Sequence, residues 1–116
     1  MLNVLITGTS TGIGQATALH LARNGYRVFA SMRNPETGST SLTDAATVEQ
    51  LPLEVIQLDV DDANSIDQAV RDVQKSAGQI DVLINNAGVG GGGPVEEIDD
   101  EFLRAMFETN FFGAMR

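Results

Sequence analysis

The chain has 116 residues, 42% of them hydrophobic, and a formal net charge of −9. This length suits one modest globular domain, and the composition argues against disorder. The acidic balance argues against a nucleic-acid partner, and the absence of cysteine excludes disulfides and thiolate metal sites.

The apolar runs are too short to cross a bilayer, and the N-terminus lacks the pattern of a secretion signal. We therefore expect a soluble, cytoplasmic protein that binds neither membrane nor nucleic acid. The single histidine, His20, lies on a predicted helix as a surface or packing residue. No metal site can be assembled around it.

The first half of the chain predicts two strands and two helices, the second of which is short. Leu2–Thr7 is a short apolar strand, and Gly12–Asn24 is rich in helix-forming residues. Arg27–Met32 is a second strand. Residues 34–46 are rich in Ser, Thr and Gly and predict a flexible loop, with a short helix around Ala45–Leu51.

The second half continues the alternation. Leu53–Leu58 is a third strand, and apolar residues at helical spacing between Asp61 and Gly78 predict an amphipathic helix. Ile80–Asn85 is a fourth strand, followed by a glycine loop over Gly90–Pro94. A last helix is predicted over Asp99–Arg116, with packing residues Phe102, Met106 and Phe107.

Strands that alternate with helices and that are apolar throughout predict an α/β fold. The expected architecture is a Rossmann-like, doubly wound parallel sheet, with strands buried on both faces and helices on either side. The expected strand order is 3-2-1-4. The fourth strand, IDVLIN, would then leave an open apolar edge, which is an aggregation hazard.

Three glycines crowd the stretch TGTSTGIG, where the first strand passes into the first helix. We expect Gly8 to allow the sharp turn, Gly12 to let the backbone approach a pyrophosphate, and Gly14 to let the helix pack closely. A helix N-terminus attracts anions, and Ser10 and Thr11 add hydroxyl donors. The alternative is a flexible loop without a ligand, because the spacing G-x3-G-x-G departs from the usual G-x-G-x-x-G.

Two further motifs would open onto the same crevice. Asp59 and Val60 follow the third strand, where Asp59 can accept a hydrogen bond from an adenine amino group or serve a helix N-terminus. Asn86, Ala87 and Gly88 follow the fourth strand. Asn86 either ties neighbouring strand ends together or forms a plain turn.

These residues resemble the short-chain dehydrogenase/reductases. TGTSTGIG is similar to that family's T-G-x-x-x-G-I-G signature, which brings in Ile13, and NNAG at 85–88 is similar to its second signature. Asp59-Val60 resembles its adenine-binding pair, and Asn110 in ETNFFG resembles the asparagine of its catalytic tetrad. The matches run in the family's order from Thr7 to Asn110, over essentially the whole chain.

The resemblance implies a dinucleotide cofactor, and the end of the second strand selects which one. NAD-preferring relatives usually carry Asp where this chain has Met32, and Arg33 follows it. A guanidinium suits the 2′-phosphate of NADP, so NADP is favoured over NAD. Arg33 could instead be a solvated surface residue. Thr11 also departs from the basic residue that many NADP-preferring relatives carry before the second glycine.

The family's chemistry is hydride transfer between nicotinamide and a carbonyl or alcohol, with a tyrosine as general acid or base. That tyrosine is aided by a lysine four residues later, and a serine completes the tetrad. Here the only tyrosine, Tyr26, is followed four residues later by Ala30, and Lys75 is the only lysine. We therefore expect residues 1–116 to form a single NAD(P)-binding domain that is incomplete at its C-terminus and inactive alone.

The resemblance also implies a small-molecule carbonyl or alcohol as substrate and a homodimer or homotetramer. Phe107, Phe111 and Phe112 would fit either such an interface or an ordinary core. The run from Gly88 to Gly93, interrupted by Val89, would lie at the front of the substrate pocket, as a mobile loop or as filler. Two other functions stay open: a non-catalytic dinucleotide-binding module, or an inert fragment that pairs with a full-length relative.

Overall fold

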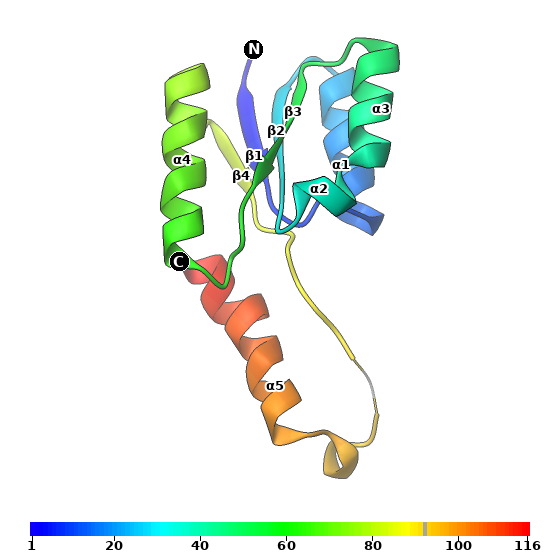
Figure 1. Ribbon diagram of the computed structural model, residues 1–116, viewed down its shortest axis with the longest axis vertical. Coiled ribbons are helices and arrows are strands. Elements are labelled where there is room, and N and C mark those ends of the chain that lie inside the picture. Colours follow the sequence, from blue (N-terminus) through cyan, green and yellow to red (C-terminus); the bar gives the residue numbers. More distant parts are fainter. Residues whose placement is uncertain (92) are drawn as a thin grey trace.

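The protein is described by a computed structural model over residues 1–91 and 93–116, shown in Figure 1. Its centre is a four-stranded parallel sheet with the order β3-β2-β1-β4. The strands are β1 (Asn3–Ile6), β2 (Arg27–Met32), β3 (Leu53–Gln57) and β4 (Val82–Ile84). The strand order and the Rossmann-like fold expected from the sequence are confirmed.

The two central strands are buried as predicted, but the two outer strands are not. Every residue of β1 is buried, whereas every residue of β3 and β4 is half-buried or exposed. An outer strand has a neighbour on one side only, so helices cover it incompletely. Leu83 of β4 is 54% exposed, which agrees with the open apolar edge expected there.

Helices cover both faces of the sheet. Helices α1 (Gly12–Arg23) and α3 (Thr40–Glu49) lie on one side, and α4 (Ala63–Ala77) lies on the other (Figure 1). Alternate residues of β2 supply two separate cores. Val28, Ala30 and Met32 pack with α1 and α3, while Phe29 packs with α4.

The segment expected to be a loop is helical instead. Residues 34–46 form α2 (Pro35–Gly38) and the first part of α3. Proline is well suited to the first position of a helix, and the fully buried Leu42 anchors α3 in the core shared with α1. Serine and threonine are only weak helix formers, so tertiary packing decided this segment against its composition.

The last helix is not regular throughout. It comprises α5 (Asp100–Phe107) and a π-helical stretch, η2 (Glu108–Gly113), and is preceded by a short 3₁₀ turn, η1 (Val95–Glu97). Figure 1 shows α5 projecting away from the sheet, with its C-terminal end returning to the turn before α4. The predicted helix over Asp99–Arg116 is present, but it widens into a π-helix at residues 108–113, which the sequence did not predict; contacts described below accompany this wider turn.

The predicted packing role of the aromatic residues on this helix is also wrong. Phe107 is 56% exposed, Phe102 is also exposed, and only Met106 is half-buried. Because α5 projects from the sheet, the described residues offer these side chains little to pack against.

Of the run from Gly88 to Gly93, residue 92 lies outside the described part of the chain. Among the described helices, none is both long and apolar enough for a membrane crossing.

Candidate functional site

A cavity of about 430 Å³ opens at the carboxyl ends of the strands. Its walls come from the turn after β1, the end of β2 with α2, the turn after β3, and the segment after β4. Thr109 of η2 completes the lining. This is the position at which open parallel sheets bind ligands, and the volume lies in the range of small-molecule sites.

The glycine turn is held against the segment after β4 by very close backbone contacts. A Cβ added to Gly14 would lie 2.1 Å from the carbonyl oxygen of Gly8, and one added to Gly8 would lie 2.7 Å from the Cα of Ala87. The expected turn at Gly8 and close packing at Gly14 are thus both present. Gly12 has a φ of +61° and nothing within 4 Å of its added Cβ, so its backbone faces open space.

Thr7 and Asn86 tie the ends of β1 and β4 together. The side chain of Asn86 donates to the carbonyl oxygens of Thr7 and Gly8, at 3.1 and 2.9 Å. In return, the Thr7 hydroxyl oxygen accepts from the backbone N–H groups of Asn86 and Ala87. Asn86 therefore makes the strand-tying contacts, and the alternative of a plain turn is excluded.

Hydrogen bonds also fix the glycine turn to β2. The backbone N–H and the hydroxyl of Thr9 both donate to the carbonyl oxygen of Ser31, and the Ser31 hydroxyl donates to the carbonyl oxygen of Ile6. Thr9 and Ser31 are fully buried. Their hydrogen bonds are made in a dry interior, so the glycine turn is rigid where it meets the sheet.

Arg33 and α2 form the side of the cavity next to β2. Arg33 is exposed and follows Met32, which is buried in the core but still contributes to the lining. Gly38 at the end of α2 lies against Ser10, since an added Cβ would come within 2.9 Å of the serine Cβ. The helix that replaced the predicted loop therefore borders the glycine turn.

Asp59 is the one predicted cofactor-binding residue that does not belong to the cavity lining. One of its carboxylate oxygens accepts from the backbone N–H of Asp61 at 2.9 Å, while Leu58 and Val60 on either side do line the cavity. The alternative that Asp59 caps α4 is excluded. Asp62 is the N-cap, and its side chain accepts from the N–H groups of Asn64 and Ser65.

Asn110 binds the segment after β4 through both atoms of its amide. Its nitrogen donates to the carbonyl oxygen of Val89, and its oxygen accepts from the N–H of the same residue, each at 2.7 Å. Gly88 lies directly against it, with an added Cβ 3.1 Å from the amide oxygen. Asn110 is thus brought to the mouth of the cavity by a contact that spans 21 positions.

The perturbed titratable groups lie elsewhere. A hydrogen bond from Arg23 holds the pKa of the Glu49 carboxyl below its usual value, and the same contact raises the pKa of Arg23. This exposed pair joins α1 to α3. At the cavity itself, an anionic ligand would meet the N-terminal end of α1 and the guanidinium of Arg33.

The remaining predicted cofactor-binding residues all contribute to one cavity. They are Gly8, Ser10, Thr11, Gly12, Ile13, Gly14, Arg33, Val60, Asn86, Ala87 and Gly88. Sequence analysis missed Asn34, Thr37 and Gly38, because they fell in the segment expected to be a loop. It also missed Thr109, which could have been suspected because it precedes the predicted site residue Asn110 in the sequence.

The chain matches the family described as short chain dehydrogenase over residues 2–116. It is 43% identical to a protein named retinol dehydrogenase 8 from Bos taurus, over 97% of this chain and 36% of that protein. The chain spans little more than a third of the length of this relative.

Solved structures with the same fold include two with bound dinucleotides. An actinorhodin polyketide ketoreductase variant with NADPH superposes with a TM-score of 0.90 at 35% identity, over 99% of this chain and 44% of that one. An alcohol dehydrogenase from the archaeon Thermococcus sibiricus, complexed with 5-hydroxy-NADP, gives a TM-score of 0.87 at 32% identity, over 97% of this chain and 48% of that one.

Proposed function

Because this chain belongs to the short chain dehydrogenase family, we propose that it supplies the cofactor-binding part of an NADP-dependent oxidoreductase. The reaction would move a hydride between the nicotinamide and a small-molecule carbonyl or alcohol. The observation that carries the proposal is the single cavity that joins the glycine turn, Arg33, Val60 and the segment after β4.

The residues present fit a dinucleotide. Gly12 leaves open space in front of its backbone at the N-terminus of α1, where a pyrophosphate would be bound by N–H groups. On one side of this point the cavity reaches the end of β2, and on the other it reaches Val89. The part that reaches β2 suits the adenosine end of the cofactor, and the part that reaches Val89 suits the nicotinamide end.

The preference for NADP rests on the end of β2. A 2′-hydroxyl is normally recognised by a carboxylate at this point, but here the positions are occupied by the buried Met32 and the exposed Arg33. A guanidinium would pair with a 2′-phosphate through two hydrogen bonds. The two solved relatives with NADPH and 5-hydroxy-NADP are consistent with this choice.

Asn110 is the proposed catalytic residue of this chain. The nicotinamide, when bound, supplies the hydride chemistry. Asn110 would hold the segment around Val89 in place beside the reacting atoms through its paired hydrogen bonds. Tyr26 packs on the core beside α1, and Lys75 is exposed on α4, so neither contributes to the cavity lining formed by the described residues. We infer that residues 1–116 bind the cofactor but do not turn over substrate.

Assembly into a homodimer or homotetramer is a further part of the proposal. Phe107, Phe111 and Phe112 are each at least half exposed, and the rings of Phe111 and Phe112 form a T-shaped pair with centroids 5.2 Å apart. Exposed aromatic side chains on a projecting helix suit an interface between protein chains. The cytoplasmic location expected from the sequence stays a prediction.

The deciding experiment is calorimetric titration of the protein with NADPH and with NADH, followed by an assay of nicotinamide absorbance with a panel of carbonyl compounds. Retinal belongs in the panel because one relative is named retinol dehydrogenase. Tighter binding of NADPH supports the cofactor assignment. Binding without turnover is the result expected for residues 1–116, and turnover by these residues alone would contradict that inference. Failure to bind either dinucleotide refutes the proposal.

A further inference from the structure

Two adjacent residues of η2 hold opposite walls of the cavity. Asn110 binds the backbone of Val89, as described above. Its neighbour Thr109 donates its hydroxyl to the carboxylate of Asp61, with distances of 3.0 and 2.8 Å to the two oxygens. Val89 follows β4 and Asp61 follows β3, so one short helical stretch connects the turns at the two outer edges of the sheet.

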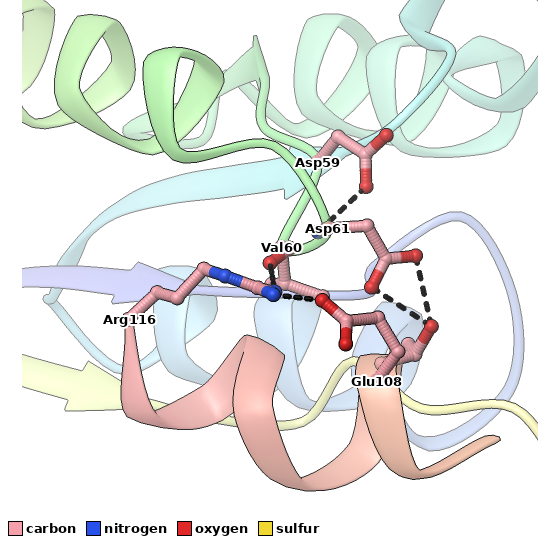
Figure 2. Close-up of polar contacts among 6 residues, drawn as sticks. Asp59, Val60, Asp61, Glu108 and Arg116 are labelled. Carbon is pink, nitrogen blue, oxygen red and sulfur yellow. Dashed lines mark hydrogen bonds and ion pairs between the residues drawn. The ribbon is translucent and has the colours of Figure 1, made fainter. Parts of the chain in front are cut away.

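Arg116 makes a second attachment to the same turn. Its guanidinium donates to the carbonyl oxygen of Val60 at 2.8 Å and pairs with the carboxylate of Glu108, as Figure 2 shows. The Arg116 side chain is 28% exposed, so this contact is partly shielded from water. The pairing with Glu108 aligns the guanidinium toward Val60.

Gly113 makes the third attachment, through close packing. A Cβ added at this position would lie 2.8 Å from a methyl carbon of Val60, and Gly113 is buried. The turn after β3 is therefore held at the Asp61 carboxylate, at the Val60 carbonyl and at the Val60 side chain. All three attachments come from η2 or from the three residues that follow it.

This turn forms the cavity wall next to the expected adenosine end. Val60 lines the cavity, and Asp59 is linked to Asp61 by the hydrogen bond to the Asp61 N–H. A shift of Asp61 would therefore move both residues of the predicted adenine-binding pair. The hydroxyl of Thr109 is the one side-chain donor from η2 that the structure places on Asp61 among the described residues.

We propose that Thr109 is a positioning residue for the adenosine end of the dinucleotide, acting through Asp61 and the turn at Asp59 and Val60. This inference rests on the proposed function. It adds that the helical stretch bearing Asn110 also sets the affinity for the adenosine half of the cofactor. The competing explanation is that Thr109 only attaches the end of the chain to the body of the protein.

The test separates the two halves of the cofactor. Dissociation constants are measured for NADPH, for adenosine 2′,5′-bisphosphate and for reduced nicotinamide mononucleotide, with the wild-type protein and with Thr109→Val. The valine keeps the shape and removes the donor. We expect binding of NADPH and of the bisphosphate to weaken by the same factor, about fivefold for one hydrogen bond. Binding of the mononucleotide should be unchanged.

Three variants sharpen the result. Thr109→Ser keeps the hydroxyl and should restore wild-type affinity. Asp61→Ala should weaken the bisphosphate as much as Thr109→Val, and the double variant should lose no more than either single one. Thr47→Val, at an exposed position of α3, is the matched control and should change nothing.

Each other outcome overturns the inference. Equal weakening of all three ligands, or a lower melting temperature without any difference among ligands, assigns Thr109 a structural role only. Additive losses in the double variant mean that Thr109 acts by direct contact, because Thr109 itself lines the cavity. If the wild-type protein binds no dinucleotide, the proposed function fails first and the inference fails with it.

Discussion

The side-chain amide of Asn110 and the backbone of Val89 are joined by two hydrogen bonds of 2.7 Å each, one in each direction. This pattern mimics the pairing of two neighbouring strands, although it joins a helix to a glycine-rich segment. It brings the residue proposed for catalysis into contact with the cavity wall that follows β4.

Asn110→Asp should release this segment. A carboxylate can still accept from the Val89 N–H but would repel the Val89 carbonyl oxygen, so one of the two bonds is lost. We expect faster hydrogen exchange at the Val89 N–H, with little change in melting temperature because the contact is exposed. Asn64→Asp, at an exposed position of α4, is the control. Unchanged exchange at Val89 would contradict the pairing.

Arg33→Asp should reverse the cofactor preference. The guanidinium that would pair with a 2′-phosphate is replaced by a carboxylate that repels it and can accept from a 2′-hydroxyl. We expect NADPH to bind at least about tenfold more weakly and NADH more tightly, measured by titration. Arg104→Asp changes the net charge equally on the projecting α5, so it separates local recognition from overall electrostatics. Equal effects of the two variants would exclude a specific role for Arg33.

Gly12→Ala and Gly14→Ala should fail in different ways. The methyl group at Gly14 has no room beside the Gly8 carbonyl, so this variant should lose about 3 kcal/mol of unfolding free energy or more. At Gly12 the space is open and the cost is the positive φ alone, about 1–2 kcal/mol. For Gly12→Ala, the loss of NADPH binding free energy should instead exceed the loss of unfolding free energy. Urea unfolding and titration measure the two effects, and equal stability losses would contradict the close contact at Gly14.

Leu42→Ala tests the first part of α3, which lies in the segment that sequence analysis expected to be a loop. Leu42 is fully buried in the core between α1, α3 and the sheet, so its truncation should cost about 2–5 kcal/mol in urea unfolding. Val48→Ala on the same helix is the control, because Val48 is 83% exposed and should change stability by less than about 0.5 kcal/mol. Similar small effects of both substitutions would mean that α3 does not pack on the sheet.

The Arg23–Glu49 pair predicts a small pH dependence. Hydrogen bonding lowers the pKa of Glu49 in the folded state, so its contribution to stability is present above the unfolded-state pKa and lost as pH falls through the folded-state value. Any difference in melting temperature between wild type and Glu49→Gln should therefore be full at neutral pH, begin to shrink near the usual glutamate pKa of about 4.3, and vanish only below the lowered folded-state pKa. It should also shrink in high salt, since both side chains are exposed to solvent. A difference that grows on acidification would contradict the sign of this pKa shift.

Sequence patterns were most reliable where local signals and burial agree. Arg27–Met32 was predicted with the bounds that β2 has, because an apolar run beginning after Asn24-Gly25 leaves little choice. The patterns failed at residues 34–46, where polar composition concealed a helix anchored by the single residue Leu42. They predicted a helix at residues 108–113 but not its π-helical turn, which accompanies contacts with Asp61, Val60 and Val89 that are distant in sequence.

The sequence by itself determined the parallel sheet, its order and the gathering of the glycine turn, Arg33 and Asn86 at one edge. These follow from alternating apolar runs and from short motifs whose chemistry is local. Only the tertiary structure decided that Asp59 accepts from the Asp61 N–H and is not among the lining residues, and that α2 borders the cavity. It also decided that Thr109 and Asn110 reach opposite walls. These features depend on contacts between segments tens of residues apart, and no local propensity encodes them.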